Sequence, residues 1–228
     1  MDSLKQYLTK FKNFGENELE KFDLFYNFLT EENKKYNLTT ITKPEDFAVK
    51  HILDSVMPID LFVKNAKVVD IGCGAGFPSV PLKIVRDDLN FTLLDSVNKK
   101  VSFCNLAVEK LNLKNIKAEH CRIEDFAIKN SEKFDICCSR AVASLPTLLE
   151  YALPLLKVGG VCIFYKSQKL EEEIDLSKNA LKILGGKITK TKQYDLQDNQ
   201  RKILVVQKIK PCPKGYPRGQ NKPRTKPL

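Results

Sequence analysis

The sequence predicts an α/β fold in which helices flank a mostly parallel, doubly wound sheet, preceded by a helical extension. Three observations lead to this prediction. Short apolar runs alternate with amphipathic stretches after residue 60, glycine pairs precede two of the runs, and 228 residues suffice for one such domain with an extension. We expect seven strands, over residues 67–71, 91–95, 115–119, 134–139, 160–165, 187–192 and 202–208. The last two have no helical stretch between them, so we expect them to pair as a hairpin.

The expected helices fall into an N-terminal group and a group between the strands. Residues 3–35 place apolar side chains on one helical face, Phe22 and Phe25 among them. A polar break follows at residues 36–39, and Pro44 then begins a helix that carries His51. Further helices are expected over residues 78–86, 98–112, 145–153 and 169–183. The chain therefore divides into a helical extension packed on the core (1–60), a core domain (61–208) and a tail (209–228).

A glycine-rich turn follows the first expected strand, in the stretch VVDIGCGAGFP at residues 68–78. The strand ends in Asp70, and the turn contains Gly72, Gly74 and Gly76. Without side chains there, a ligand can lie against bare backbone and face the amide groups of the next helix. The dinucleotide fingerprint G-x-G-x-x-G would put its third glycine at Phe77, so the spacing differs. The stretch instead resembles motif I of the class I S-adenosylmethionine-dependent methyltransferases, whose Rossmann-like sheet is seven-stranded, mostly parallel and ends in an antiparallel strand.

A second candidate cofactor residue lies one strand later. The apolar run at residues 91–94 ends at Asp95, about twenty residues after the glycines. A carboxylate at that place can accept hydrogen bonds from both ribose hydroxyls of an adenosyl group. A structural alternative is that Asp95 and Ser96 cap the helix that follows. The two interpretations are compatible, because Ser96 can cap the helix while Asp95 binds the ribose.

The positive charge of the chain is concentrated at its C-terminus. Of the net charge of +10, residues 208–228 contribute +7, since they hold seven basic residues and no acidic one; the first 207 residues therefore carry +3. The same segment is rich in proline, so we expect it to be extended or mobile on its own. We interpret it as a phosphate-binding arm for RNA, with a solubilising tail as the structural alternative.

Other features limit the possible classes of protein. The seven cysteines are scattered without a C-x-x-C pair, and we expect them to be reduced residues of a cytoplasmic protein. No apolar run is long enough to span a membrane, and the N-terminus lacks a signal-peptide core. His51 and Asp54 are three residues apart on one helix, but His120 is the only other histidine. We therefore expect no metal site.

The segment after the fourth strand indicates the acceptor atom of a methyltransferase. Enzymes that methylate an exocyclic amine usually carry Asn/Asp-Pro-Pro-Tyr there, whereas residues 138–141 read Cys-Ser-Arg-Ala. Cytosine C5 methylation needs an activated cysteine, and strand alternation would bury Cys137 or Cys138. Guanine N7 suits the sequence better, because its lone pair is available at neutral pH and no general base is needed. Arg140 is placed to stack on a base or to contact a phosphate, unless it is an ordinary surface arginine.

Several motifs in order along the chain resemble the RsmG (GidB) family of bacterial 16S ribosomal RNA guanine-N7 methyltransferases. They are YNLT at 36–39, HILDS at 51–55, DIGCGAGFPSVPL at 70–82, FTLLDSVNKKVSF at 91–103, CRIE at 121–124, SRAVASL at 139–145, Arg201 before the final ILVV strand, and the YPR…PL tail. The resemblance covers nearly the whole chain. The Tyr-Lys-Ser around Lys166 departs from the more common Leu-Lys-Gly.

The resemblance implies roles for individual residues. The expected cofactor contacts are Gly72, Phe77, Ile123, Glu124 and Arg140, to which the turn and the ribose argument add Gly74, Gly76 and Asp95. The residues expected on the RNA side are His51, Asp54, Lys99, Lys100, Arg122, Lys166, Arg201, Arg218, Lys222 and Arg224. Arg140, His51 and Arg122 are the candidates for positioning the target base.

The resemblance also implies a reaction. The methyl donor would be S-adenosylmethionine, with S-adenosylhomocysteine as product, and the acceptor N7 of the guanine at position 527 of 16S ribosomal RNA, giving 7-methylguanosine. The partner would be the small ribosomal subunit or its RNA, and the protein a cytoplasmic monomer. Another RNA or a small-molecule acceptor for the same fold stays an alternative, because fold does not fix substrate. A non-enzymatic RNA-binding protein is disfavoured by the intact glycine turn.

Overall fold

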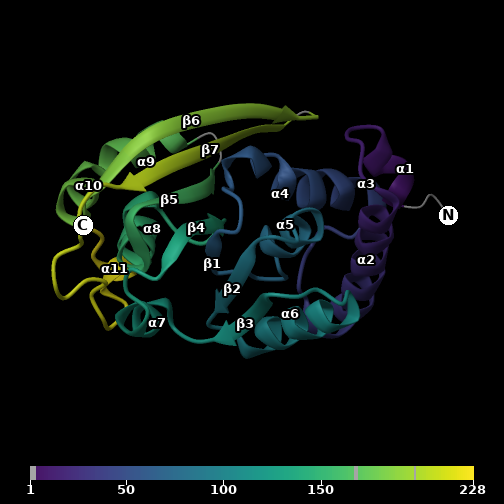
Figure 1. Ribbon diagram of the computed structural model, residues 1–228, viewed down its shortest axis with the longest axis horizontal. Coiled ribbons are helices and arrows are strands. Elements are labelled where there is room, and N and C mark those ends of the chain that lie inside the picture. The colour runs from purple at the N-terminus through teal and green to yellow at the C-terminus, as the bar shows by residue number, and fades with distance from the viewer. Residues whose placement is uncertain (1–3, 167–168, 198) are drawn as a thin grey trace.

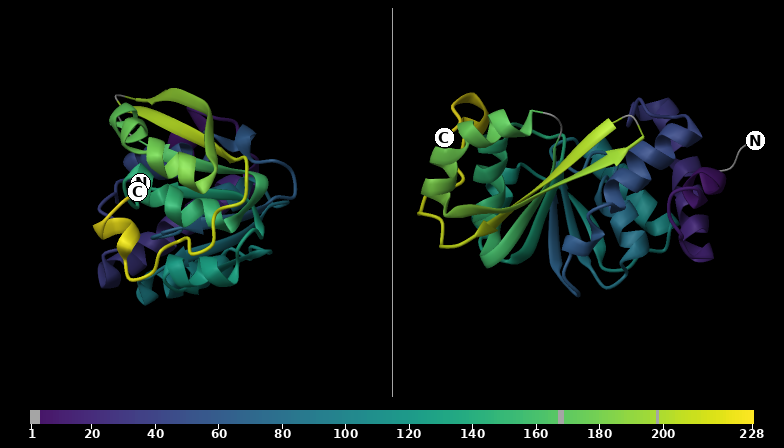
Figure 2. Two further views of the ribbon diagram at one scale, coloured as in Figure 1. Left: turned by 90° about the vertical axis from the view of Figure 1, so that its left-hand side faces the viewer. Right: turned by 90° about the horizontal axis from the view of Figure 1, so that it is seen from above.

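The computed structural model describes residues 4–166, 169–197 and 199–228. A central sheet lies between two layers of helices, as the view from above in Figure 2 shows. One apolar core joins the sheet to the N-terminal helices and to α5 (Ser79–Val85) and α6 (Asn98–Lys110). A second core lies on the opposite face, beneath α7 (Ile123–Lys129), α8 (Leu145–Ala152), α9 (Leu170–Leu176) and α10 (Lys178–Leu184). The predicted α/β fold is confirmed.

The sheet has the seven predicted strands in the order β3-β2-β1-β4-β5-β7-β6. They are β1 (Lys67–Ile71), β2 (Asn90–Asp95), β3 (Ile116–His120), β4 (Phe134–Arg140), β5 (Leu156–Lys166), β6 (Gly186–Leu196) and β7 (Asn199–Lys208). Strands β1 to β5 are parallel, and β7 pairs antiparallel with both β5 and β6, which confirms the hairpin. The hairpin is longer than predicted, because polar and charged residues continue the extended pairing beyond its apolar centre (Figure 1).

The N-terminal region is not one continuous helix, as predicted, but two. Helix α1 (Leu4–Thr9) and helix α2 (Glu16–Tyr36) are separated by a short break, and residue 3 lies outside the described residues. Gly15 ends the break, where its N–H donates to the Glu18 carboxylate over 2.8 Å and so caps α2. The helix predicted from Pro44 is present as α3 (Pro44–Phe47), a π-helical turn (Ala48–Leu53) and α4 (Asp54–Val56) in succession.

Two further differences concern the helices of the second face. The helix predicted over residues 169–183 is divided into α9 and α10 at Ser177. The Ser177 hydroxyl donates to the Glu173 carbonyl over 2.6 Å, a local bond that competes with helix continuation. Helix α7 was not predicted, because its seven residues are too few for a clear apolar period.

The tail packs against the core domain, contrary to the expectation of an extended or mobile segment. Pro217 and Pro223 are buried, and the short helix α11 (Lys222–Thr225) lies beside α8 (Figure 1). Lys208, counted with the basic segment in the sequence, belongs to β7 and is fully buried, with its ammonium bound to the Glu132 carboxylate and the Leu156 carbonyl. Not all of the C-terminal charge is therefore available to a partner.

Aromatic side chains connect the N-terminal helices to the core. Phe25 of α2 is fully buried, with its ring centroid 5.5 Å from that of Phe77 and 6.4 Å from that of Phe103. Phe47 of α3 completes the group at 6.3 Å from Phe25. The helical extension therefore shares one apolar core with the first face of the sheet.

We predict that Phe25→Ala lowers the free energy of unfolding by about 3–5 kcal/mol, because it leaves a cavity between the extension and the sheet. Leu24, on the same helix but 38% exposed, is the control, and its replacement by alanine costs less than about 1 kcal/mol. Urea unfolding followed by circular dichroism measures both. A Phe25→Ala protein as stable as the Leu24→Ala control would show that the extension does not depend on this core.

Candidate functional site

Two cavities open at the carboxyl edge of the parallel strands. Strands β1 and β4 are neighbours there although the helices that follow them lie on opposite faces, and such a switch point is where α/β sheets bind ligands. The first cavity measures about 360 Å³ and the second about 440 Å³, within the usual range of ligand pockets. The loop after β4 lines both, with Ala141 on each, Val142 on the first and Ala143 on the second.

The glycine turn forms the floor of the first cavity. The N–H of Gly72 donates to the Leu94 carbonyl over 2.8 Å, which ties the turn to β2. Gly72 has φ 74°, and a Cβ at this position would lie 2.4 Å from Cγ2 of Val142. At Gly76, with φ 87°, a Cβ would lie 2.7 Å from Cγ2 of Val80. Both backbone conformation and close packing therefore require glycine at these two positions.

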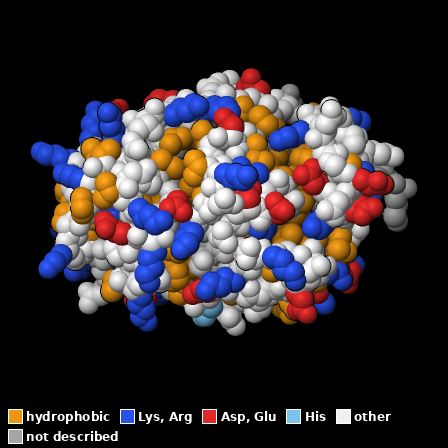
Figure 3. All heavy atoms as spheres, viewed as in Figure 1, with side chains coloured by type: hydrophobic (Ala, Val, Ile, Leu, Met, Phe, Trp, Pro, Cys, Tyr) orange, Lys and Arg blue, Asp and Glu red, His pale blue; other side chains and the backbone are white. Residues whose placement is uncertain are grey.

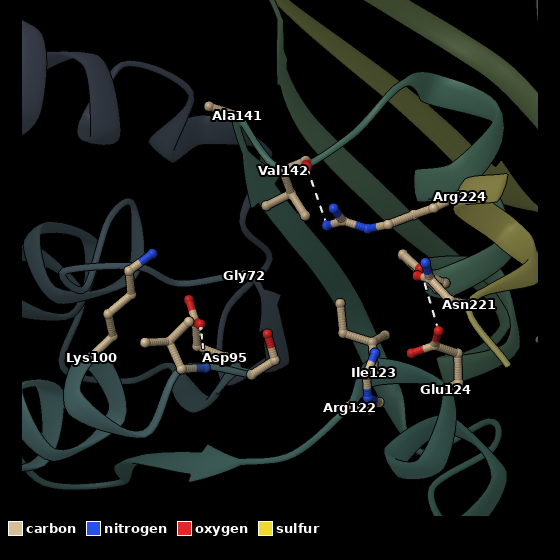
Figure 4. Close-up of a pocket in the computed structure, with 13 residues that line it drawn as sticks. Gly72, Asp95, Lys100, Arg122, Ile123, Glu124, Ala141, Val142, Asn221 and Arg224 are labelled. Carbon is tan, nitrogen blue, oxygen red and sulfur yellow. Dashed lines mark hydrogen bonds between the residues drawn. The ribbon is translucent and has the colours of Figure 1, made fainter. Parts of the chain in front are cut away.

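Asp95 stands beside the turn and lines the first cavity (Figure 4). Its carboxylate accepts the N–H of Gly74 over 3.0 Å and the N–H of Val97 over 2.9 Å. The carboxylate thus fixes the turn and the start of α6 at once. The helix has no side-chain cap of its own, so the suggested capping role of Ser96 is not observed. Asp95 is 7% exposed, and its accessible surface faces the first cavity.

The opposite wall of the first cavity comes from α7, α8 and the tail. Ile123 and Glu124 begin α7, and the hydroxyl of Tyr151 donates to the buried Glu124 carboxylate over 3.4 Å. Asn221 and Arg224 reach the cavity from the tail, across from Asp95 (Figure 4). This wall offers apolar, amide and charged groups, whereas the floor offers bare backbone.

Asp70 lies beneath the turn and lines neither cavity. It is fully buried; Oδ2 accepts the Ser79 hydroxyl over 2.7 Å, while Oδ1 has no hydrogen-bond partner among the described residues. Burial raises the pKa of Asp70 to about 7. An unpaired buried acceptor directly under a ligand-sized cavity is typical of functional sites.

Arg140 organises the second cavity from the end of β4. Its guanidinium donates to the Asp54 carboxylate over 2.9 Å and to the Lys50 carbonyl over 3.0 Å, and it lies over the Phe77 ring, 5.0 Å from the centroid. Its other terminal nitrogen lies 3.0 Å from Nδ1 of His51. One side chain of the sheet thus binds three residues of the helical extension and one of the glycine turn.

His51 is neutral in this arrangement. Because the guanidinium only donates, Nδ1 accepts, and the network assigns the proton to Nε2, which lies 2.9 Å from the Thr39 hydroxyl. Burial and the positive charge of Arg140 lower the pKa of His51 to about 3. The ring also stacks on Phe77, with 4.1 Å between the centroids. His51 therefore has no free acceptor nitrogen with which to act as a general base.

Asp54 is surrounded by donors. It is 4% exposed, and besides Arg140 it contacts Nε of Arg201 at 3.3 Å and the Tyr194 hydroxyl at 3.2 Å. Lys50, Lys166 and Lys202 also line the second cavity. The lining of this cavity thus combines a buried carboxylate with an excess of basic side chains.

The structure separates the predicted site residues into three groups. The first cavity is lined by Gly72, Asp95, Lys100, Arg122, Ile123, Glu124 and Arg224. The second cavity is lined by His51, Asp54, Arg140, Lys166 and Arg201. Neither cavity is lined by Gly74, Gly76, Phe77, Lys99, Arg218 and Lys222. The two cavities share Ala141 as a lining residue.

Several residues that line the two cavities were not predicted from the sequence. Val142, Tyr151 and Asn221 belong to the first cavity, and Tyr165 and Tyr194 to the second. Val142 lies within the SRAVASL motif, which could have indicated it. Tyr165 directly precedes Lys166, and Asn221 lies within the YPR…PL tail, so these segments could have indicated them as well. Tyr151 and Tyr194 lie outside the motifs, so only packing places them. Within the described residues, no group of three or more His, Cys, Asp and Glu is placed to hold a metal, and no helix has the length and apolar character to cross a membrane.

The chain is similar in sequence to one family of known proteins. The family GidB, described as rRNA small subunit methyltransferase G, matches residues 18–204. A ribosomal RNA small subunit methyltransferase G of Clostridium botulinum (strain Alaska E43 / Type E3) is 43% identical over 217 residues, which cover 92% of this chain and 91% of that protein. A protein of the same name from Desulforamulus reducens is 42% identical over 233 residues, covering 99% and 97%.

A solved structure shares the fold alone. TYW2 of M. jannaschii, described as in complex with AdoMet, superposes with a TM-score of 0.55 at 14% identity and covers 70% of this chain and 76% of that one. The family match spans the extension from residue 18, the glycine turn, all of the second cavity and the first cavity except for Asn221 and Arg224 of the tail. The chain therefore belongs to the GidB family of small-subunit ribosomal RNA methyltransferases.

Proposed function

We propose that this protein transfers a methyl group from S-adenosylmethionine to N7 of a guanine in 16S ribosomal RNA, at position 527, and releases S-adenosylhomocysteine. The observation that carries the proposal is the pair of cavities that share Ala141. One places Asp95 beside a bare glycine turn, and the other is lined by basic groups around a neutral histidine. Relatives named ribosomal RNA small subunit methyltransferase G, which are 42–43% identical to this chain, support the choice of substrate.

The first cavity fits an adenosyl group. Asp95 offers a carboxylate for ribose hydroxyls, Gly72 lets a ligand approach the backbone, and Ile123 and Glu124 face the space left for a base. When bound, S-adenosylmethionine supplies an electrophilic methyl carbon. Arg140, next in the chain to Ala141, holds the end of β4 at the junction of the two cavities.

The second cavity fits an acceptor that needs no deprotonation. Guanine N7 has a free lone pair, so a site without a general base suffices, and His51 cannot serve as one. Methylation at N7 leaves a positive charge on the base. Asp54 is not free to neutralise that charge, because it is paired with Arg140 and Arg201; it instead holds these groups in place. Arg140 and Tyr165 provide surfaces that position a planar ring. We assign these residues to base positioning, with Arg122 at the rim of the first cavity.

Basic side chains around the cavities support an RNA substrate. Lys166, Arg201 and Lys202 line the second cavity, and Lys100 the first. On the face in Figure 3, Lys and Arg gather over the C-terminal half, whereas Asp and Glu are more frequent over the N-terminal helices. We therefore propose the small ribosomal subunit or its RNA as partner and the cytoplasm as location, with the protein acting as a monomer.

Two assays test the reaction. Ribosomal RNA from cells that lack the protein and from cells that regain it is digested and mapped by mass spectrometry, and 7-methylguanosine is expected only with the protein. In vitro, purified protein is given labelled S-adenosylmethionine and either small subunits, stripped 16S RNA or small-molecule acceptors. Methylation of a small molecule but of neither RNA substrate would overturn the proposal.

We predict that Asp95→Ala weakens the binding of S-adenosylhomocysteine by at least about tenfold, because it removes the carboxylate that binds ribose and fixes the Gly74 amide. Calorimetric titration measures the affinity. Asp125→Ala is the matched control, since Asp125 is an exposed acid of α7 that does not line the cavity. Retention of RNA should change little in either variant. Equal affinities of the two variants for the ligand would rule out the ribose role.

We predict that His51 makes stability depend on pH. Its pKa is about 3 in the folded chain and about 6.5 when unfolded, so between these values only the unfolded chain takes up a proton here. Stability is therefore lost as pH falls below 6.5, by about 1 kcal/mol between pH 7 and pH 5.5. Urea unfolding at both pH values measures the loss of unfolding free energy. The loss should be smaller in His51→Gln than in the native chain, but unchanged in His120→Gln, the exposed control. The same loss in both variants would contradict the assignment.

A further inference from the structure

We propose that the C-terminal tail is a wall of the cofactor cavity, with Asn221 and Arg224 contacting the adenine end of the ligand, rather than a free arm for RNA. The inference rests on the proposed function, since it takes the first cavity to be the S-adenosylmethionine site. It assigns two ligand contacts to a segment whose composition indicates only phosphate binding.

A buried ion pair anchors the tail. Glu150 of α8 is fully buried, and its carboxylate accepts three hydrogen bonds from Arg218: from the backbone N–H and Nε over 2.8 Å each, and from the guanidinium terminus over 2.7 Å. A buried carboxylate without this partner would be strongly destabilising. Arg218 is therefore committed to the fold and is not available as a phosphate contact.

Further contacts continue the attachment up to the end of the chain. The buried Thr147 hydroxyl donates to the Pro223 carbonyl over 2.8 Å, and the Arg218 guanidinium donates to the Lys226 carbonyl over 2.9 Å. Leu228 packs against the second core. Thr147 and Glu150 lie on the same helix as Tyr151, which lines the cavity. Helix α8 thus positions the tail and the cavity wall together.

The attached tail directs two side chains at the cavity. Arg224 donates to the Val142 carbonyl over 3.4 Å, and Val142 packs on Gly72 of the turn. Asn221 lies above Glu124, on the side of the cavity away from Asp95 (Figure 4). Lys222, between them in sequence, is exposed and does not line the cavity.

The chemistry of the two side chains suits a purine. If Asp95 takes the ribose, the base extends toward Ile123, Glu124 and the tail. An asparagine amide has both a donor and an acceptor, which match the N6 amine and a ring nitrogen of adenine. A guanidinium plane can stack on the purine face. The tail thus supplies groups for recognising adenine that the glycine turn and Asp95 do not.

The test compares point variants of the full chain, because truncating the tail would leave Glu150 buried without its partner. Asn221→Ala and Arg224→Ala are expected to weaken binding of S-adenosylhomocysteine about tenfold each in calorimetric titration. Lys222→Ala, which removes one positive charge from the same short helix, should bind as the native chain does. Thermal unfolding without ligand should be nearly unchanged in Arg224→Ala and Lys222→Ala, whose side chains are exposed. Asn221 has φ 58°, which asparagine tolerates better than alanine, so Asn221→Ala should lose a little stability, and its affinity is measured well below its unfolding temperature.

A second measurement follows the native protein without any substitution. Trypsin cuts after a basic residue unless proline follows it, so the tail can be cut after Arg224 but not after Lys222, which precedes Pro223. S-adenosylhomocysteine should slow cleavage after Arg224 at least about fivefold if it binds against the tail. Cleavage within α2, after Lys21, is the reference site far from the cavity. No protection of the tail at saturating ligand would overturn the inference.

The outcomes distinguish this inference from the proposed function. Native affinity in both Asn221→Ala and Arg224→Ala, with weakened binding in Asp95→Ala, would refute the tail contacts and leave the function intact. Equal losses of ligand affinity in Arg224→Ala and Lys222→Ala would show a general charge effect and also refute them. Failure of the native protein to bind the ligand at all would instead refute the proposed function.

Discussion

The guanidinium of Arg140 is the interaction on which the arrangement of the site depends. It links the end of β4 to the helical extension through the carboxylate of Asp54, the carbonyl of Lys50 and the ring of His51. Both partners of the ion pair are largely buried, at 15% and 5% side-chain exposure. Loss of one partner of such a pair typically costs about 3–5 kcal/mol, because the other charge stays buried. The second cavity therefore exists only while the extension is docked on Arg140.

The two cavities follow from the topology of the sheet. Strands β1 and β4 are adjacent, so the loops after them diverge to opposite faces and leave room at their carboxyl ends. The loop after β4 turns through Ala141, which has φ 57°, an unusual conformation for a residue with a side chain. That turn puts Val142 against Gly72 on one side and Ala143 beside Lys166 on the other. A methyl donor and an acceptor base held in separate cavities would meet at this short loop.

Much of the fold was determined locally, by patterns that neighbouring residues create. The sequence pattern predicted all seven strands. The signal is clearest for β1 and β4, which are buried along nearly their whole length, whereas the edge strands β3 and β6 keep exposed polar residues. The glycine spacing and the acid at the end of β2 indicated the first cavity, since backbone conformation and close packing at Gly72 and Gly76 require glycine. Asp95 was predicted because it ends a strand about twenty residues after the glycines, whereas Ile123 and Glu124 were expected from the family resemblance; all three line the first cavity.

Two features depend on contacts between distant segments and could be seen only in the tertiary structure: the charge network of the second cavity and the attachment of the tail. No local pattern shows that Asp54 would meet Arg140 and Arg201, because 86 residues separate the first pair and the contact exists only after the extension docks. The tail has the composition of a mobile arm, yet its Arg218 binds the buried Glu150. The positive charge of Arg218, which the composition suggested was available to RNA, is therefore used to hold the fold together. The sequence by itself determined the seven strands, the fold class and the glycine turn beside the first cavity. Packing decided which basic side chains are free for a partner and which side chains complete the walls of the two cavities. Both depend on which buried acidic and polar groups take up those side chains as partners.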